Sequence, residues 1–288
     1  MRRLIVTADD FGLSPAVNEA VERAHREGIL NTASLMVGEA AAADAVARAR
    51  RLPGLRVGLH VVVACGRPVL APAKIPSIVD AAGRLPASLV GAGFLYGFSR
   101  RARRELQAEI EAQFEAYAAT GLALDHVDAH CHMHLHPMVL EMILRTGERH
   151  GMRAMRLPYE PATYPAAGGW YPGRWLNGAF LAPWLLRVRR RLHRAGIATA
   201  DRVFGLYDTG RMTADRTAAV LAALPEGVTE IYLHPAASGD GPWPLDPAAC
   251  AAEFAALIDA RVIAAMRGRG VQAWSYSEQS GRGAAVPI

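Results

Sequence analysis

One short stretch of the chain alternates apolar residues with residues that can bind metals or move protons. It runs from His126 to His136, reads HVDAHCHMHLH and holds five of the ten histidines. In a β-strand alternate side chains point to opposite faces, so an extended conformation would place the imidazoles and Asp128 on one face. A helix would scatter them, and a chance histidine-rich strand end would leave the rings in water. Because buried, unpartnered imidazoles are costly and histidine is the commonest side-chain metal ligand, the extended interpretation predicts a metal site.

Other polar residues stand at the ends of apolar runs that predict strands. They are Asp9 and Asp10 after residues 4–8, His60 after 55–59, His130 at the end of 123–130, Arg156 within 153–157, and His234 after 229–233. A lone histidine at a strand end is often structural. The shared placement predicts a site, because the carboxyl ends of the strands form the active-site face of a parallel barrel.

Strand-type runs alternate with helical patterns along all 288 residues. The helices are expected at 15–27, 40–52, 103–120, 137–150, 184–195, 213–224 and 247–269, with further strands at 33–37, 202–206 and 271–275. Seven or eight such units without a break in composition predict an α/β fold with a single domain over 1–288. The expected architecture is a parallel (β/α) barrel, either a regular TIM barrel or a distorted form of it. Loop insertions are expected at about 61–99 and 158–183. A doubly wound open sheet is the alternative, but it usually carries a glycine-rich phosphate loop where this chain has Asp9 and Asp10.

The adjacent Asp9 and Asp10 predict two separate roles. Side chains at consecutive positions of an extended segment diverge, so one carboxylate can bind a metal while the other accepts a proton. The alternative is a turn before the helix that Ser14 would cap. Two imidazoles with one carboxylate would leave coordination positions open for water, which is typical of a catalytic site. Such donors favour one divalent metal ion, with zinc first and magnesium or another divalent cation as alternatives.

Four motifs resemble a known family, the YdjC-like (ChbG/HpnK) carbohydrate deacetylases. They are TADDFG at 7–12, GLH at 58–60, HVDAH at 126–130 and HPA at 234–236, and the resemblance covers Leu4 to about Trp274. Within the family the chain most resembles the HpnK type associated with hopanoid biosynthesis. More distantly, residues 7–10, 156–159 and 233–234 are similar to NodB-type polysaccharide deacetylases.

The resemblance implies a role for each strand-end residue. Asp9 is expected to be the general base, Arg156 to orient it and His234 to be the general acid, while Asp10, His60 and His130 are expected to bind the metal. The chain departs from the NodB-type pattern, in which the two metal histidines lie a few residues apart. The third ligand therefore depends on the YdjC-like pattern alone.

The activity implied is a metal-dependent hydrolase that removes the N-acetyl group from an N-acetylglucosamine-type sugar, carried by a hopanoid glycolipid or by soluble chitooligosaccharides. A barrel metallohydrolase for another amide or a phosphoester is an alternative, but such enzymes usually place a His-x-His pair after the first strand. A metal- or sugar-binding module is a second alternative, and it would need neither a base nor an acid.

Four residues are predicted to contact the substrate: His132, His134, Tyr159 and Trp170. Aromatic residues with Gly and Pro on a loop above a barrel commonly stack on sugar faces, although a hydrophobic cluster that fastens the loop is an equal alternative. His132, His134 and Asp128 can instead orient the metal ligands.

The composition limits the partners and the compartment. A net charge of +5, almost all of it arginine because Lys74 is the only lysine, is too small to predict nucleic-acid binding. Three widely spaced cysteines predict free thiols in a reducing compartment. The N-terminus is too short and acidic for a signal peptide, and no apolar window reaches the ~20 residues of a membrane span. We therefore expect a cytoplasmic protein, of an oligomeric state that the sequence does not indicate.

Residues 180–194 combine an apolar stretch with an arginine cluster. One alternative, which the helical spacing favours, is an ordinary helix whose apolar stripe faces the sheet. The other is a peripheral contact with the inner membrane, in which Phe180, Leu181 and Trp184 meet a bilayer while the arginines meet anionic headgroups.

Overall fold

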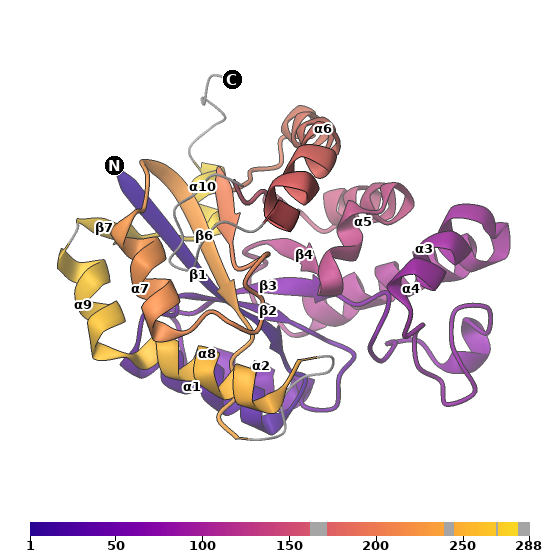
Figure 1. The fold of residues 1–288 in the computed structure, drawn as a ribbon. Helices are drawn as coiled ribbons and strands as arrows, with labels where there is room; N and C mark the ends of the chain where they lie inside the picture. The colour runs from indigo at the N-terminus through magenta and orange to yellow at the C-terminus, as the bar shows by residue number, and fades with distance from the viewer. Residues whose placement is uncertain (162–171, 239–244, 269, 282–288) are drawn as a thin grey trace.

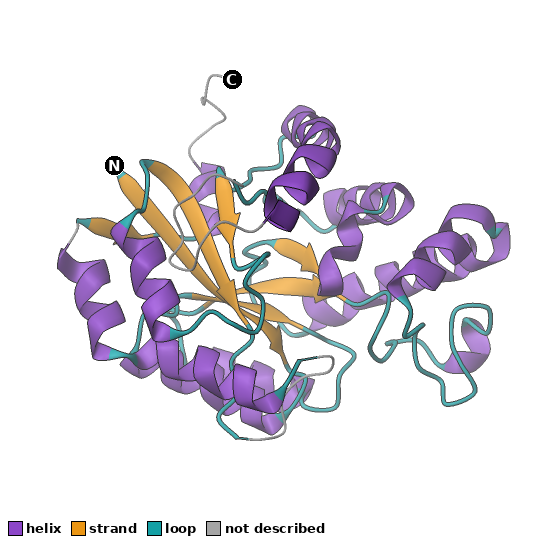
Figure 2. Cartoon of the chain, in the orientation of Figure 1, coloured by secondary structure: helices purple, strands orange, loops and turns teal. Residues whose placement is uncertain are grey.

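The structure, a computed structural model, describes residues 1–161, 172–238, 245–268 and 270–281. Its centre is a twisted parallel sheet of seven strands, with α-helices packed around it (Figures 1 and 2). The strands are β1 (Arg2–Phe11), β2 (Thr32–Leu35), β3 (Arg56–Val61), β4 (Val127–Ala129), β5 (Arg202–Phe204), β6 (Gly227–Leu233) and β7 (Val271–Ala273). The path runs β4-β3-β2-β1-β6-β5, and β7 pairs with β1. The predicted parallel α/β fold is thus confirmed.

Ten α-helices and two 3-10 turns connect these strands in the described residues. They are α1 (Pro15–Glu27), α2 (Ala42–Arg50), η1 (Pro72–Lys74), α3 (Leu89–Phe98), α4 (Arg100–Ala119), η2 (His130–Leu135), α5 (Pro137–Arg149), α6 (Pro172–Arg194), α7 (Ala214–Ala222), α8 (Pro247–Ile258), α9 (Ala260–Gly268) and α10 (Tyr276–Gly281). The segment 61–99, expected to be loop with short helical pieces, contains η1 and α3. The insertion at 158–183 was also expected to be irregular, but its second half belongs to α6. The helix expected at 247–269 is divided at Asp259, whose side chain accepts the Arg261 N–H and so begins α9.

The first strand is the axis of the sheet. One edge of β1 pairs with β6 from Arg2 to Ala8, and the other edge is divided between β7 at its start and β2 at its end. Where β7 and β2 part, the Asn31 side chain accepts the Val6 N–H at 2.8 Å and donates to the carbonyl of Trp274 at 3.1 Å. The strand is buried on both faces, which explains its continuous apolar run. Paired on both edges and buried on both faces, β1 has a fixed position in the sheet, and so does its carboxyl end.

The described residues do not form a closed barrel of continuous ladders. Segment 153–157, predicted as the fifth strand, is joined to its neighbours only by the single bridges Val127↔Met155 and Ala154↔Ala198. Pro158 follows at once and has no N–H to donate, so the ladder stops there. The observed sheet is a curled part of the predicted barrel.

Gly58 in β3 makes room for the ring of His126. A Cβ atom built on Gly58 would lie 2.4 Å from Cε1 of this ring. The ring cannot move aside, because its two nitrogens contact Asp125 at 3.0 Å and Ser34 at 3.0 Å, and it stacks on Tyr276. The glycine is thus required by packing and not by a turn.

We expect Gly58→Ala to lower the free energy of unfolding by about 1–3 kcal/mol, the usual cost of an overpacked core. Urea unfolding followed by circular dichroism measures this. Gly268→Ala is the matched control, because nothing lies within 4 Å of its Cβ position and its φ is not in the left-handed region. Equal stability of the two variants would contradict the packing role of Gly58.

Candidate metal and catalytic site

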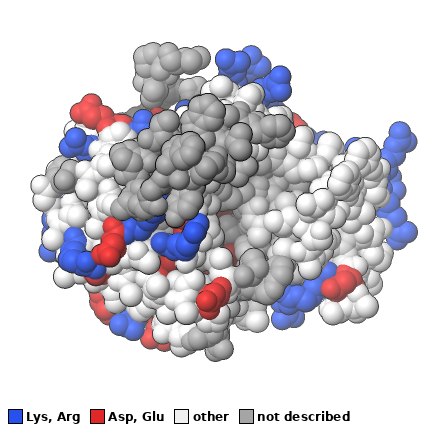
Figure 3. Space-filling view, viewed as in Figure 1, with Lys and Arg blue, Asp and Glu red and all other residues white. Residues whose placement is uncertain are grey.

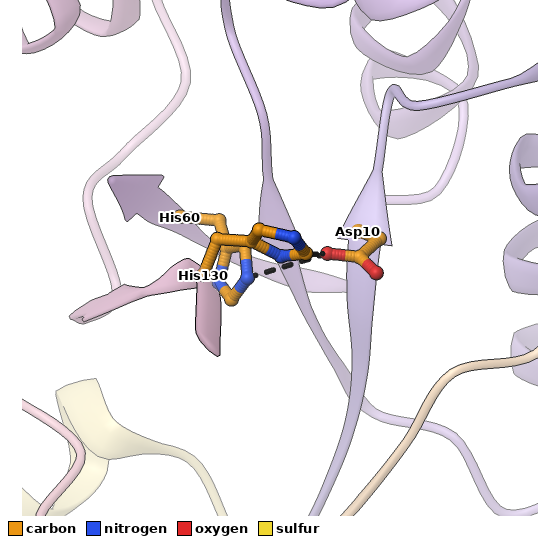
Figure 4. Close-up of side chains that lie close together, drawn as sticks. All are labelled: Asp10, His60 and His130. Atoms are coloured by element: carbon orange, nitrogen blue, oxygen red, sulfur yellow. Dashed lines mark hydrogen bonds and ion pairs between the residues drawn. The ribbon is translucent and has the colours of Figure 1, made fainter. Parts of the chain in front are cut away.

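The carboxyl ends of β1, β3 and β4 bring Asp10, His60 and His130 together. Potential ligand atoms of all three lie within 4.8 Å of one another, and all three residues are buried. Oδ1 of Asp10 is 2.9 Å from Nδ1 of His130 and 3.3 Å from Nε2 of His60, and Figure 4 shows both rings turned toward the carboxylate. These are the residues that the resemblance implies as metal ligands, and the structure brings them to one point.

Asp10 owes its direction to an irregularity in β1. Its φ is +63°, in the left-handed region, and the pairing of β1 with β2 shifts register between Ala8 and Phe11. Such a bulge turns one side chain away from the regular alternation, and aspartate tolerates this conformation better than most residues do. The irregularity separates the carboxylates of Asp9 and Asp10, which serve different neighbours.

His60 is held from behind by a carboxylate. Its Nδ1 lies 2.7 Å from Oδ1 of Asp128, leaving Nε2 to face Asp10. This carboxylate–histidine contact is the arrangement that fixes the tautomer of a metal-binding imidazole. Asp128, for which the sequence left open ligand orientation or sugar contact, lies where it can orient His60.

Arg156 is fully buried and pairs with three carboxylates. Its terminal nitrogens lie 2.7 and 2.8 Å from the two oxygens of Asp9, 2.7 Å from Asp128 and 2.8 Å from Glu230. Glu230 is fixed in turn by the hydroxyls of Thr7 and Tyr276, each at 2.6 Å. Three buried carboxylates thus share one guanidinium, and a fourth, Asp10, has no arginine partner among the described residues; this excess of negative charge suits an added cation.

The surrounding charges show which residues fit a divalent metal. A second group, Asp9, His60 and Asp128, is equally compact, but both of its carboxylates already contact Nη1 of Arg156. A cation there would face the guanidinium at close range. Among the described residues, the ion-pair contacts of the Asp10 carboxylate are with imidazoles only. Asp10, His60 and His130 therefore fit the metal, and two nitrogens with one oxygen suit zinc.

The carboxylates around Asp10, His60 and His130 also stabilise positive charge at this site. Burial lowers the pKa of His60, but Asp128 and Asp10 more than offset this and raise it to about 10. For His130, burial likewise lowers the pKa, and Asp10 raises it well above its usual value.

His234 directly follows β6, and its ring lies near Asp9. Its Nε2 is 4.0 Å from Oδ2 of Asp9. Its backbone N–H donates to Glu253 of α8 at 2.6 Å, and Nδ1 lies 3.8 Å from the same oxygen. Burial lowers the pKa of His234, but Glu253, Asp10 and Asp9 raise it above the usual value. A raised pKa favours the protonated imidazole, which is the form that can serve as an acid.

The extended conformation predicted for residues 126–136 was wrong after Ala129. The ladder with β3 ends at Ala129, and η2 follows, with Cys131 and His132 at a φ of +53°. Without a partner strand, the backbone turns and forms its own bonds, such as the His136 N–H to the Met133 carbonyl. The five rings consequently do not share one face.

The histidines of this stretch lie in different surroundings. His126 is buried and contacts the hydroxyl of Ser34, whereas His130 contacts Asp10. His132 contacts the hydroxyl of Tyr232 at 3.0 Å, and its ring meets the His134 ring edge-on. Burial lowers the pKa of both His132 and His134, the latter to about 4, so both rings are neutral. The predicted substrate contacts of this pair stay predictions.

The other predicted substrate contacts are less central. Tyr159 packs against the core, with Arg189 of α6 over its ring at 5.2 Å, which matches the alternative of a cluster that fastens the loop. Trp170 lies outside the described residues.

Three acidic or aromatic residues of the site were not predicted from the sequence: Glu230, Glu253 and Tyr276. A signal for Glu230 exists, since it is the one charge within the apolar strand TEIYL.

Helix α6 packs one apolar face against the protein core. Leu185, Val188 and Leu192 are buried, Leu181 packs against the core, and the indole N–H of Trp184 donates to the Leu135 carbonyl at 3.0 Å. The side chain of Phe180 lies outside the described residues. The structure thus agrees with the ordinary-helix alternative for 184–194, and Leu181 and Trp184 are not a free membrane-facing surface.

The fold and the site define a parallel α/β protein with a buried Asp/His group at its strand ends. The family model of YdjC-like proteins matches residues 3–267. A carbohydrate deacetylase of Geobacillus stearothermophilus is 32% identical over 284 residues, covering 96% of this chain and 98% of that protein. The chain therefore belongs to the YdjC-like family.

Two further comparisons agree with this membership. A carbohydrate deacetylase of Thermoanaerobacter pseudethanolicus is 25% identical over 237 residues, which cover 82% of each chain. A crystal structure from Enterococcus faecalis V583, of a protein named for cellobiose-phosphate cleavage, shares the fold with a TM-score of 0.72 at 21% identity. That match covers 96% of this chain and 97% of the other. Within the described part of the chain, no helix has the length and apolar character of a membrane span.

We expect His60→Ala and His130→Ala each to lower the bound metal well below one ion per chain, because each removes one of only three candidate ligands. Elemental analysis of the purified variants after dialysis measures it. His193→Ala, an exposed position on α6, is the matched control and should keep the metal of the unaltered protein. One full equivalent of metal in His130→Ala would exclude that residue as a ligand.

Proposed function

We propose that this chain is a metal-dependent carbohydrate deacetylase, which hydrolyses the acetamide of an N-acetylglucosamine-type sugar. The observation that carries the proposal is the division between two adjacent carboxylates. Asp10 meets two imidazoles, whereas Asp9 meets Arg156 and lies 4.0 Å from His234. A metal site, a base candidate and an acid candidate thus converge. The carbohydrate deacetylases among the relatives support the same reaction.

Asp10, His60 and His130 would hold the metal, which would polarise the acetamide carbonyl and lower the pKa of a water molecule. In this proposal Asp9 accepts the proton of the attacking water. The guanidinium of Arg156 holds both oxygens of Asp9, so the carboxylate cannot rotate away from the site.

In this proposal His234 completes the cleavage. An amine is a poor leaving group unless it is protonated as the C–N bond breaks, and the raised pKa of His234 favours the protonated ring that this step needs. Glu253 accepts the backbone N–H of His234 and faces Nδ1 of its ring, while Nε2 faces Asp9.

The proposed reaction defines the substrate only as an N-acetylated amino sugar. The resemblance to the HpnK type favours one linked to a hopanoid lipid in the cytoplasm, and soluble chitooligosaccharides are the alternative. Release of acetate from each, with and without a chelator, separates these sugars from another amide or a phosphoester. A protein that binds sugar and releases no acetate from either would contradict the proposal.

We expect Asp9→Asn to keep the metal, which Asp10 would hold, and to lose deacetylation by at least ~10²–10⁴-fold, the contribution of proton transfer. Steady-state acetate release together with metal analysis measures both effects. Asp215→Asn, at an exposed position on α7, is the matched control. Near-normal turnover of Asp9→Asn would assign the base to another residue.

We expect His234→Gln to slow the hydrolysis of acetamides far more than that of activated acetate esters, because only the amine needs a proton to leave. The ratio of kcat/KM for the two substrate types measures this difference. His193→Gln should leave the ratio unchanged. Equal losses on amide and ester would indicate a structural role for His234.

A further inference from the structure

Helix α3 carries an apolar stripe that no described part of the protein covers. Val90, Phe94 and Phe98 are 71%, 61% and 80% exposed, and they recur every fourth residue, on one face of the helix. Leu89 is 40% exposed beside them, and the rings of Phe94 and Phe98 stack at 6.0 Å. Large hydrophobic side chains exposed together on a monomer mark a surface for interaction.

The opposite face of α3 fastens the helix to the protein. Ala92 and Tyr96 are buried, and the Tyr96 hydroxyl donates to the Val63 carbonyl at 2.6 Å. Cβ positions on Gly93 and Gly97 would lie 3.7 and 3.9 Å from the His136 ring, at the end of the segment that begins at His130. Helix α3 is therefore held beside the turn that carries a candidate ligand, with the stripe on its exposed face.

Arginines begin immediately after the stripe. Ser99 ends α3 and caps α4, whose first turns expose Arg100, Arg101 and Arg104. Arg101 pairs with Glu105, whereas Arg100 and Arg104 have no ion-pair partner among the described residues. Basic side chains line the outer edge of the molecule in Figure 3, at the end where Figure 1 shows α3 and α4.

We propose that this α3 surface, formed by Leu89, Val90, Phe94, Phe98, Arg100 and Arg104, docks on the anionic face of a lipid bilayer. The apolar side chains enter the boundary between headgroups and acyl chains, and the free guanidinium groups meet lipid phosphates. A partly apolar and partly cationic surface needs a partner that offers both hydrocarbon and negative charge, and a lipid surface does so.

A second copy of the chain fits this surface less well. A two-fold contact would place the patch against itself and bring the arginines of both copies together. The four exposed side chains also offer on the order of a few hundred Å², below the ~800 Å² that each partner buries in a stable complex.

The test is co-sedimentation of the full chain with vesicles made of equal parts phosphatidylglycerol and phosphatidylcholine. We expect binding at low salt that weakens as salt rises, and no binding to pure phosphatidylcholine. Phe94→Ser/Phe98→Ser and Arg100→Gln/Arg104→Gln should each lower the affinity at least about tenfold. Both pairs are exposed, so circular dichroism should show an unchanged fold.

Leu186→Ser is the matched control, because Leu186 is an exposed apolar residue on α6, 53% accessible. It should bind vesicles as the unaltered protein does. Three results would overturn the proposal: no binding of the unaltered chain at low salt, equal binding by the Phe94→Ser/Phe98→Ser variant, or a dimer in sedimentation velocity that this variant abolishes. Vesicle binding is measured without substrate, so its failure leaves the proposed reaction untouched.

Discussion

The buried guanidinium of Arg156 is the interaction on which the site depends. It joins Asp9 of β1, Asp128 of β4 and Glu230 of β6, and β4 pairs with neither of the other two strands. Burying a charge costs several kcal/mol unless it is paired and its hydrogen bonds are satisfied, and each of these carboxylates would be similarly costly without the arginine. The pairing with Arg156 therefore offsets the cost of burying these three acids in neighbouring parts of the sheet.

The same network separates the tasks of neighbouring groups. Because Arg156 holds Asp9 and Asp128, Asp10 is the one of these three acids whose described ion-pair contacts are with imidazoles only. Asp128 links the two halves, since one oxygen contacts Arg156 and the other contacts His60. The position of a metal-binding ring is thus coupled to the position of the base through one carboxylate, and a change in either would be felt by the other.

Local patterns succeeded where their physical cause was local. The alternation of residues 126–130 did indicate a strand, but the sheet provides a partner only as far as Ala129, and no local pattern records where a neighbouring strand ends. The apolar run before the arginines of α6 left a free surface open, yet Leu181 and Trp184 pack against the core. The exposed apolar stripe of α3 lies within the segment 61–99, which was expected to be loop with short helical pieces, and the sequence did not single the stripe out.

The sequence by itself determined the parallel α/β class and the residues at the strand ends, because the carboxyl ends of parallel strands must meet at one edge. It also determined that Asp9 and Asp10 could act separately. Only the tertiary structure decided the partners: His60 with Asp128, Arg156 with Glu230, His234 with Glu253, and Gly58 beneath His126. These contacts join residues 19 to 74 positions apart, so they follow from how the helices and strands pack and from no spacing along the chain.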